Sequence, residues 1–191
     1  MTYSLKNVFY LSFEHEYENG TYNAANEVGI TPIDVSAYVD PIAKGSRRGQ
    51  GLAVYRIHAM AGTSQNTPVQ ETEVSANGFA LTVKPYTTTG DGLASSAIDR
   101  TDLGPASDVC IWAGQNFGTA SYAGSEPLVY TVCEPSDEVP FVVVRDTIYA
   151  IFQCNGPSGL SADQVINYRM ECAMITLDTA TLNQLLRTQT V

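Results

Sequence analysis

Charged residues are scarce in this sequence, and positive ones are the scarcest. Of the 191 residues, 16% are Asp, Glu, Lys or Arg, and ten Lys and Arg against twenty Asp and Glu give a formal net charge of −10. A free-standing nucleic-acid binder usually carries a basic patch, whereas only Lys44, Arg47 and Arg48 cluster here. We interpret that cluster as a solvated loop and expect no sequence-specific binding of nucleic acid.

Long apolar runs are also missing. Nowhere do eighteen apolar residues follow one another, so we expect no membrane-spanning helix. The N-terminal stretch has no basic start followed by an apolar core, so we expect no secretory signal peptide. The four cysteines match no zinc, haem or redox spacing. We interpret Cys110, Cys133, Cys154 and Cys172 as reduced, buried thiols in preference to disulfides.

The residues that usually carry catalysis form no recognisable set. His15 and His58 are the only histidines, too few for the several histidines of a cupin metal site on a jelly roll. No G-x-S-x-G motif occurs. Glu171 shares a strand face with Arg169, and we interpret it as part of a cross-strand ion pair and not as a catalytic acid. We therefore expect no enzymatic activity, no cofactor and no metal site.

Two apolar-rich runs near the end of the sequence alternate with period two. One face of the first run carries Val142, Val144, Ile148, Ala150 and Phe152, and one face of the second carries Ile166, Tyr168, Met170, Cys172 and Met174. This alternation is typical of strands with one buried face. Turn-forming residues at 155–159 separate the two runs. We interpret them as a long antiparallel pair that a second sheet must cover.

Further strands are predicted at residues 6–17, 52–60, 71–85 (interrupted at Asn77-Gly78 by a hairpin or a bulge), 109–113 and 127–133. Residues 22–31 resemble a loop, and residues 32–40 form a short extended or helical piece. Residues 179–187 form a predicted helix, with an apolar stripe of Leu182, Leu185 and Leu186. About eight strands with long, unequal loops predict one domain over residues 1–191. It is an all-β, eight-stranded antiparallel jelly-roll sandwich with a short C-terminal helix. An immunoglobulin-like sandwich, which usually has shorter loops, is the second choice. The predicted core between the sheets is Phe9, Leu11, Phe13, Val142, Val144, Ile148, Ile166, Tyr168 and Met170.

Two long loops, residues 86–106 and 114–125, are rich in small residues and show no sustained period. Long loops in compact domains are usually functional or make contacts, and aromatic side chains are favoured interface anchors. The candidate interface residues are therefore Tyr86, Ile98, Phe117 and Tyr122, together with Leu182, Leu185 and Leu186 of the predicted helix.

Two segments carry a family resemblance, namely residues 33–60 and the two apolar runs with the residues that follow them. The matching residues are Arg48, Gly51, Tyr55, Ile57, Asp146, Tyr149, Arg169, Glu171, Leu177 and Leu185. They resemble the single-jelly-roll major capsid proteins of tailless icosahedral viruses of archaea and bacteria. The sequence departs from that pattern at Cys172, where the family often has an aromatic residue.

The resemblance implies a structural protein, a major capsid protein of which many copies form an icosahedral shell. Its partners would be further copies of itself and other capsid or vertex proteins, and its location the virion, assembled in the host cytoplasm. No basic arm precedes the first strand. Since such an arm often neutralises packaged nucleic acid, we expect either an inner membrane beneath the shell or a separate protein on the genome.

Two other classes stay open at this stage. A carbohydrate-binding, lectin-like jelly roll requires aromatic side chains on one sheet face or loop set, and the sequence has aromatics to supply them. A glycoside hydrolase requires two carboxylates facing each other in a cleft, which the count of acidic residues alone permits. Fold analogy favours the capsid class over both.

Overall fold

The computed structural model describes residues 8–17, 28–40, 48–63, 77–83, 107–117, 128–154 and 164–189. They form nine strands and one helix, which are β1 (Phe9–Tyr17), β2 (Val28–Asp34), β3 (Arg48–Thr63), β4 (Asn77–Thr82), β5 (Cys110–Phe117), β6 (Leu128–Cys133), β7 (Phe141–Val143), β8 (Thr147–Cys154), β9 (Gln164–Asp178) and α1 (Thr179–Thr188). Residues 28–31, predicted as loop, are in fact the start of β2.

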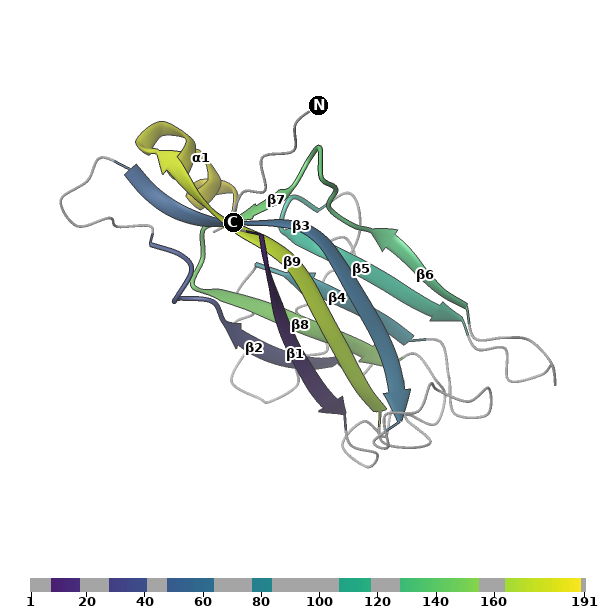
Figure 1. Cartoon of the computed structure of the whole chain (residues 1–191). Coiled ribbons are helices and arrows are strands. Elements are labelled where there is room, and N and C mark those ends of the chain that lie inside the picture. The colour runs from purple at the N-terminus through teal and green to yellow at the C-terminus, as the bar shows by residue number, and fades with distance from the viewer. Residues whose placement is uncertain are drawn as a thin grey trace, which may run out of the picture.

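The strands form two antiparallel sheets packed face to face. The first sheet has the order β1-β9-β3-β7 and the second β2-β8-β4-β5-β6. Figure 1 shows β1, β9 and β3 in front of the layer that holds the second sheet. The chain changes sheet from β1 to β2, from β2 to β3 and from β3 to β4. It changes sheet again from β6 to β7, from β7 to β8 and from β8 to β9. This interleaving of two four-stranded sheets confirms the predicted jelly-roll sandwich, and β6 adds a further strand to one sheet.

The predicted pairing of the two long apolar runs is wrong. β8 pairs with β2 and β4, whereas β9 pairs with β1 and β3. The first run is not one strand, because it contains β7 and β8, which belong to opposite sheets. The chain crosses between the sheets over residues 144–146, and the backbone N–H of Val35 donates to the carbonyl oxygen of Asp146 there.

The core between the sheets is apolar and rich in aromatic rings. The predicted core residues Ile148, Ile166, Tyr168 and Met170 are buried in it, and Phe9, Leu11 and Phe13 pack against it from β1. Tyr168 of the first sheet stacks on Phe13 and meets Trp112 of the second sheet edge-on, with ring centroids 6.0 Å apart. Such contacts contribute about 0.5–1.5 kcal/mol beyond the burial of area, and they tie the sheets together.

Val142 and Val144 were predicted in this core but lie outside it. They belong to a separate cluster with Leu177 and Leu182, on the side of the sheet that α1 covers. In β7 it is Val143 that points between the sheets and is fully buried. The side chains on both faces of this short strand are therefore apolar, because one face packs against the second sheet and the other against the helix.

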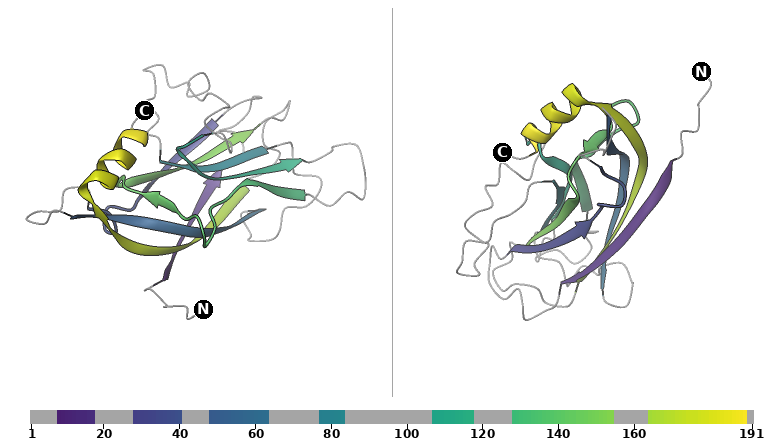
Figure 2. Two further views of the ribbon diagram at one scale, coloured as in Figure 1. Left: turned by 90° about the horizontal axis from the view of Figure 1, so that it is seen from above. Right: turned by 90° about the vertical axis from the view of Figure 1, so that its left-hand side faces the viewer.

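The C-terminal helix packs on its own domain. The carboxylate of Asp178 caps it by accepting from the Thr181 N–H at 2.9 Å. Leu182 is buried against the outer side of the first sheet at Gly49, where a Cβ atom would lie 2.5 Å from Leu182 Cδ2. Glycine thus gives the helix room to approach the sheet. Figure 2 shows α1 across one end of the sandwich, directly after β9.

A β-bulge at Tyr55 divides β3 into two halves. Val54 pairs with Cys172 and Arg56 with Glu171, so Tyr55 is an extra residue opposite β9. Before the bulge Leu52 and Val54 point into the core, and after it Ile57 does. The bulge therefore sends Arg56 and the residues that alternate with it to the outer side of the sheet.

Candidate functional site

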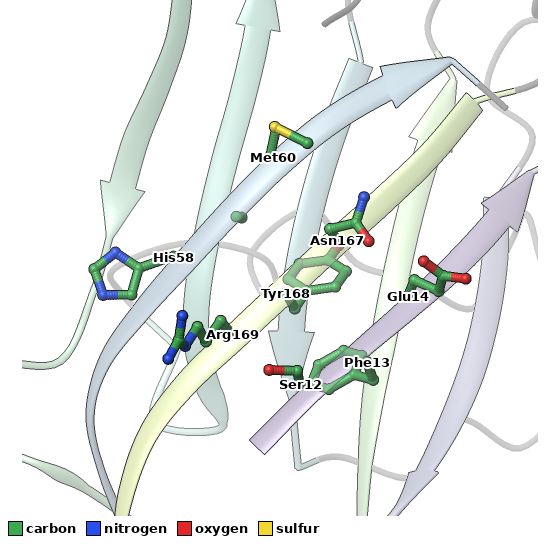
Figure 3. A pocket seen from close by; sticks show the side chains of 9 residues that line it. Ser12, Phe13, Glu14, His58, Met60, Asn167, Tyr168 and Arg169 are labelled. Atoms are coloured by element: carbon green, nitrogen blue, oxygen red, sulfur yellow. The ribbon is translucent and has the colours of Figure 1, made fainter. Parts of the chain in front are cut away.

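The part of the first sheet that α1 leaves uncovered presents an open polar surface. We call it the outer face and define it by Tyr10, Ser12, Glu14, Glu16, Arg56, His58, Met60, Asn167, Arg169 and Glu171. Alternation along β1 exposes its first four members while Phe9, Leu11 and Phe13 point inward. Figure 3 shows the central residues of this face on three neighbouring strands.

The strand register arranges the outer face in rows that run across β1, β9 and β3. Tyr10, Glu171 and Arg56 form the first row. Ser12, Arg169 and His58 form the second, and the third consists of Glu14, Asn167 and Met60. Side chains directly opposite each other on neighbouring strands are about 4.5–5.5 Å apart at Cβ, so the members of a row are neighbours, and two contacts join the second row to the first.

Three contacts organise the charges on this face, and the first is an ion pair in which Nη2 of Arg56 lies 3.7 Å from Oδ2 of Asp137. Nε2 of His58 lies 3.2 Å from Oε1 of Glu171. The guanidinium carbon of Arg169 lies 3.9 Å from the centre of the Tyr10 ring, a cation–π contact. The predicted cross-strand contact of Glu171 thus exists with His58 as its partner, while Arg169 turns toward β1 and its tyrosine.

A shallow hollow of about 670 Å³ lies over the second and third rows. Its rim is formed by Ser12, Glu14, His58, Met60, Asn167 and Arg169. The side chains of Phe13 and Tyr168 belong to the core, so only their backbones can line its floor. The hollow combines an amide, a hydroxyl, a carboxylate and a guanidinium, which suits binding through hydrogen bonds.

His15 and Cys172 point to the inner side of the first sheet, whereas Cys110 belongs to a separate buried cluster with Ala80 and Ile151 of the second sheet. Burial lowers the pKa of His15 below 6.5 against an opposing effect of Glu16. Burial also raises the pKa of Cys110 and of Cys172 to about 12. Both are free thiols, as predicted, and at neutral pH they stay protonated and unreactive. Among the described residues no three His, Cys, Asp or Glu side chains are grouped to hold a metal ion.

The structure describes four of the seven predicted interface residues. Leu182 is buried within its own domain, and Leu185 and Leu186 are half-buried beside it. This placement leaves Leu182 unavailable to a partner. Phe117 ends β5, whereas Tyr86, Ile98 and Tyr122 lie outside the described residues. The outer face was not predicted as a unit, although the polar parities of residues 9–17 and 164–172 are visible in the sequence.

Fold and surface together define the protein as a jelly-roll β-sandwich with one open, polar sheet face. No protein-family model matches the chain, and no curated protein matches it either. Within the described part of the chain, no helix is both long enough and apolar enough to cross a membrane.

Proposed function

We propose that this chain is a viral major capsid protein, a non-enzymatic structural protein that assembles in many copies into an icosahedral shell. The observation that carries the proposal is the strand order, β1-β9-β3-β7 against β2-β8-β4-β5-β6. Jelly rolls with two interleaved four-stranded sheets are the fold of many capsid domains and of many lectins. The resemblance of residues 33–60 and of the C-terminal runs to capsid proteins favours the first of these classes.

The protection of the sheet edge at β7 supports a role as a structural subunit. β7 is an edge strand of the first sheet, and exposed edges invite uncontrolled pairing with other chains. The side chain of Gln189 occupies this edge, because it donates to the Val142 carbonyl and accepts from the Val144 N–H. Copies would therefore meet through side-chain surfaces of defined shape and not by open strand pairing at β7.

The proposed partners are further copies of the chain, other capsid or vertex proteins, and a membrane beneath the shell; the proposed location is the virion. The test is negative-stain electron microscopy of the purified chain across salt and protein concentration, with sedimentation velocity on the same samples. Closed particles or regular lattices are the expected result. A protein that remains monomeric under every condition contradicts the proposal.

A carbohydrate-binding module is the second candidate, and the hollow on the outer face favours it. Sugars are recognised by polar hydrogen-bonding groups beside an aromatic ring, and Arg169, at the rim of the hollow, contacts the ring of Tyr10. Retention of the native chain on a glycan array, lost in Tyr10→Ala and kept in the distant control Glu138→Gln, would support this function. If the native chain is not retained on the array, the carbohydrate-binding function is contradicted.

A further inference from the structure

Cys110 and Cys133 lie on neighbouring strands of the second sheet. β6, which ends at Cys133, is the edge strand of this sheet and pairs with β5, which begins at Cys110 (Figure 1). Cys133 is directly opposite Ala113 in the register of the two strands. The side chain of Cys110 reaches toward the same place, because its Sγ lies 3.5 Å from the carbonyl oxygen of Trp112, in the peptide group that joins Trp112 to Ala113. The strand register therefore brings the two thiols side by side.

The two thiols also contact each other. They pack in one cluster with Ala80, Ala113 and Ile151, on the opposite side of the second sheet from the core. Burial raises the pKa of both thiols, that of Cys110 to about 12, and the thiol of Cys110 donates a hydrogen bond to Sγ of Cys133. Because the side chain of Ala113 ends at Cβ, it leaves the space between the two sulfur atoms open.

The two cysteines differ in their access to solvent. Cys133 is half-buried at the sheet edge, whereas Cys110 is buried, so a small reagent reaches Cys133 first. A disulfide needs Cβ atoms about 3.5–4.5 Å apart, which requires a small movement of one strand. β6 can make this movement, because it is an edge strand and because its register shifts by one residue at Val132, directly before Cys133.

We propose that Cys110 and Cys133 are a redox-sensitive pair, which a small-molecule disulfide such as oxidised glutathione converts to an intrachain disulfide. First, the Cys133 thiolate attacks one sulfur of the small disulfide. A mixed disulfide forms, the S–S bond of the reagent breaks, and the leaving thiolate takes up a proton. Then Cys110 loses its proton and its Sγ attacks Sγ of Cys133, which forms the protein disulfide and releases the second small thiol. Two protein thiols are thus oxidised, and the small disulfide is reduced to two thiols.

The disulfide fastens the edge strand β6 to its sheet. It closes the loop of residues 110–133, which restricts the unfolded chain and stabilises the folded one. An edge strand that is held in place is also less able to leave its sheet and pair with another chain. Because the link lies within one copy, the inference does not depend on assembly into a shell.

The test is a redox titration of the full chain at pH 8 in mixtures of reduced and oxidised glutathione. Acid stops the exchange, N-ethylmaleimide in urea blocks the remaining thiols, and mass spectrometry locates each link in unreduced chymotryptic peptides. Chymotrypsin cleaves at the aromatic residues between the two cysteines. The linked Cys110–Cys133 peptides should increase with the share of oxidised glutathione and disappear in dithiothreitol. Cys172, buried in the core, is the internal control and should stay free throughout.

Two variants test the order of the steps. Cys110→Ala lacks the second thiol, so it should accumulate the mixed disulfide of Cys133 with glutathione. Cys133→Ala should leave Cys110 free, because the buried thiol does not meet the reagent. Circular dichroism shows whether each variant folds, and the titration of the native chain decides the proposal even where one does not. The oxidised native chain should melt about 5–10 °C above the reduced one.

Several outcomes would overturn the proposal. A native chain whose two thiols stay free in oxidised glutathione alone overturns the pair. A link between the Cys133 residues of two copies, seen as a dimer in non-reducing electrophoresis, overturns it as well. Glutathione on Cys110 in the Cys133→Ala chain overturns the order of attack. Equal melting temperatures of the oxidised and reduced chains overturn the fastening of β6.

Discussion

Gln189 fastens the C-terminal helix to the edge of the first sheet. It is 2% exposed, and its Nε2 donates to the carbonyl oxygen of Val142 at 2.6 Å. Its Oε1 accepts from the backbone N–H of Val144 at 3.2 Å. One side chain thus provides the donor and the acceptor that a neighbouring strand would present to β7. α1 has only ten residues, too short to be stable alone in water, so its position depends on such contacts.

Gln189→Ala removes both hydrogen bonds and leaves the buried Val144 N–H without its partner. Each bond contributes about 0.5–1.5 kcal/mol net, and an orphaned buried donor costs about 1–3 kcal/mol. Because these terms overlap, we expect the free energy of unfolding to fall by about 2–4 kcal/mol. Gln189→Glu keeps the acceptor but sets a carboxylate against the Val142 carbonyl. It should be less stable than Gln189→Ala at neutral pH and regain stability on acidification, when the protonated carboxyl can donate again.

The measurement is urea unfolding followed by far-ultraviolet circular dichroism and by the fluorescence of the single tryptophan, Trp112. Gln184→Ala is the matched control, since Gln184 is exposed on the same helix, and it should change stability by less than about 0.5 kcal/mol. If Gln189→Ala unfolds at the same urea concentration as this control, the helix is held by its leucines alone and the reasoning fails.

Three further predictions concern the core and its titratable groups. Ile148→Ala, at a fully buried site, should cost about 2–5 kcal/mol, and Leu11→Ala, at a half-buried site on β1, clearly less; equal losses in urea unfolding would contradict the burial described. Because the pKa of His15 in the folded protein lies below 6.5, its imidazole is protonated at a higher pH in the unfolded chain than in the folded one. Stability should therefore decline as pH drops through 6.5, and His15→Gln should flatten this part of the pH profile of the melting temperature. Cys110 and Cys172, whose pKa values are raised to about 12, should resist iodoacetamide at pH 8 in the folded protein, as peptide mass spectrometry would show, and react once urea unfolds it.

The sequence predicts the fold class because apolar and polar residues alternate clearly where one face of a strand is buried and the other is exposed to solvent. Ile166, Tyr168 and Met170 are in the core for that reason. Alternation fails at β7, where the helix covers one side and the second sheet the other. Val142, Val143 and Val144 are then apolar on both parities, and the crossing between sheets is hidden.

The outer face illustrates a different limit. The alternation of polar and apolar residues along β1 and β9 predicts which of their side chains lie on this face. On β3 the bulge at Tyr55 shifts the alternation by one residue, so the side chains on the face cannot be read from the pattern there. Nothing in the local pattern of residues 52–60 marks an extra residue there. The contacts of Tyr10 with Arg169 and of His58 with Glu171 can be placed only once the register of three strands is known, because the partners in each pair are far apart in sequence.

The central claim is that copies of this chain build a shell. The most direct test is cryo-electron microscopy of the purified full chain after concentration, with particle diameters checked by light scattering. We expect closed particles of uniform diameter, whose subunit envelope fits the two-sheet sandwich. A monodisperse species of 20.6 kDa at every concentration and salt condition would contradict it.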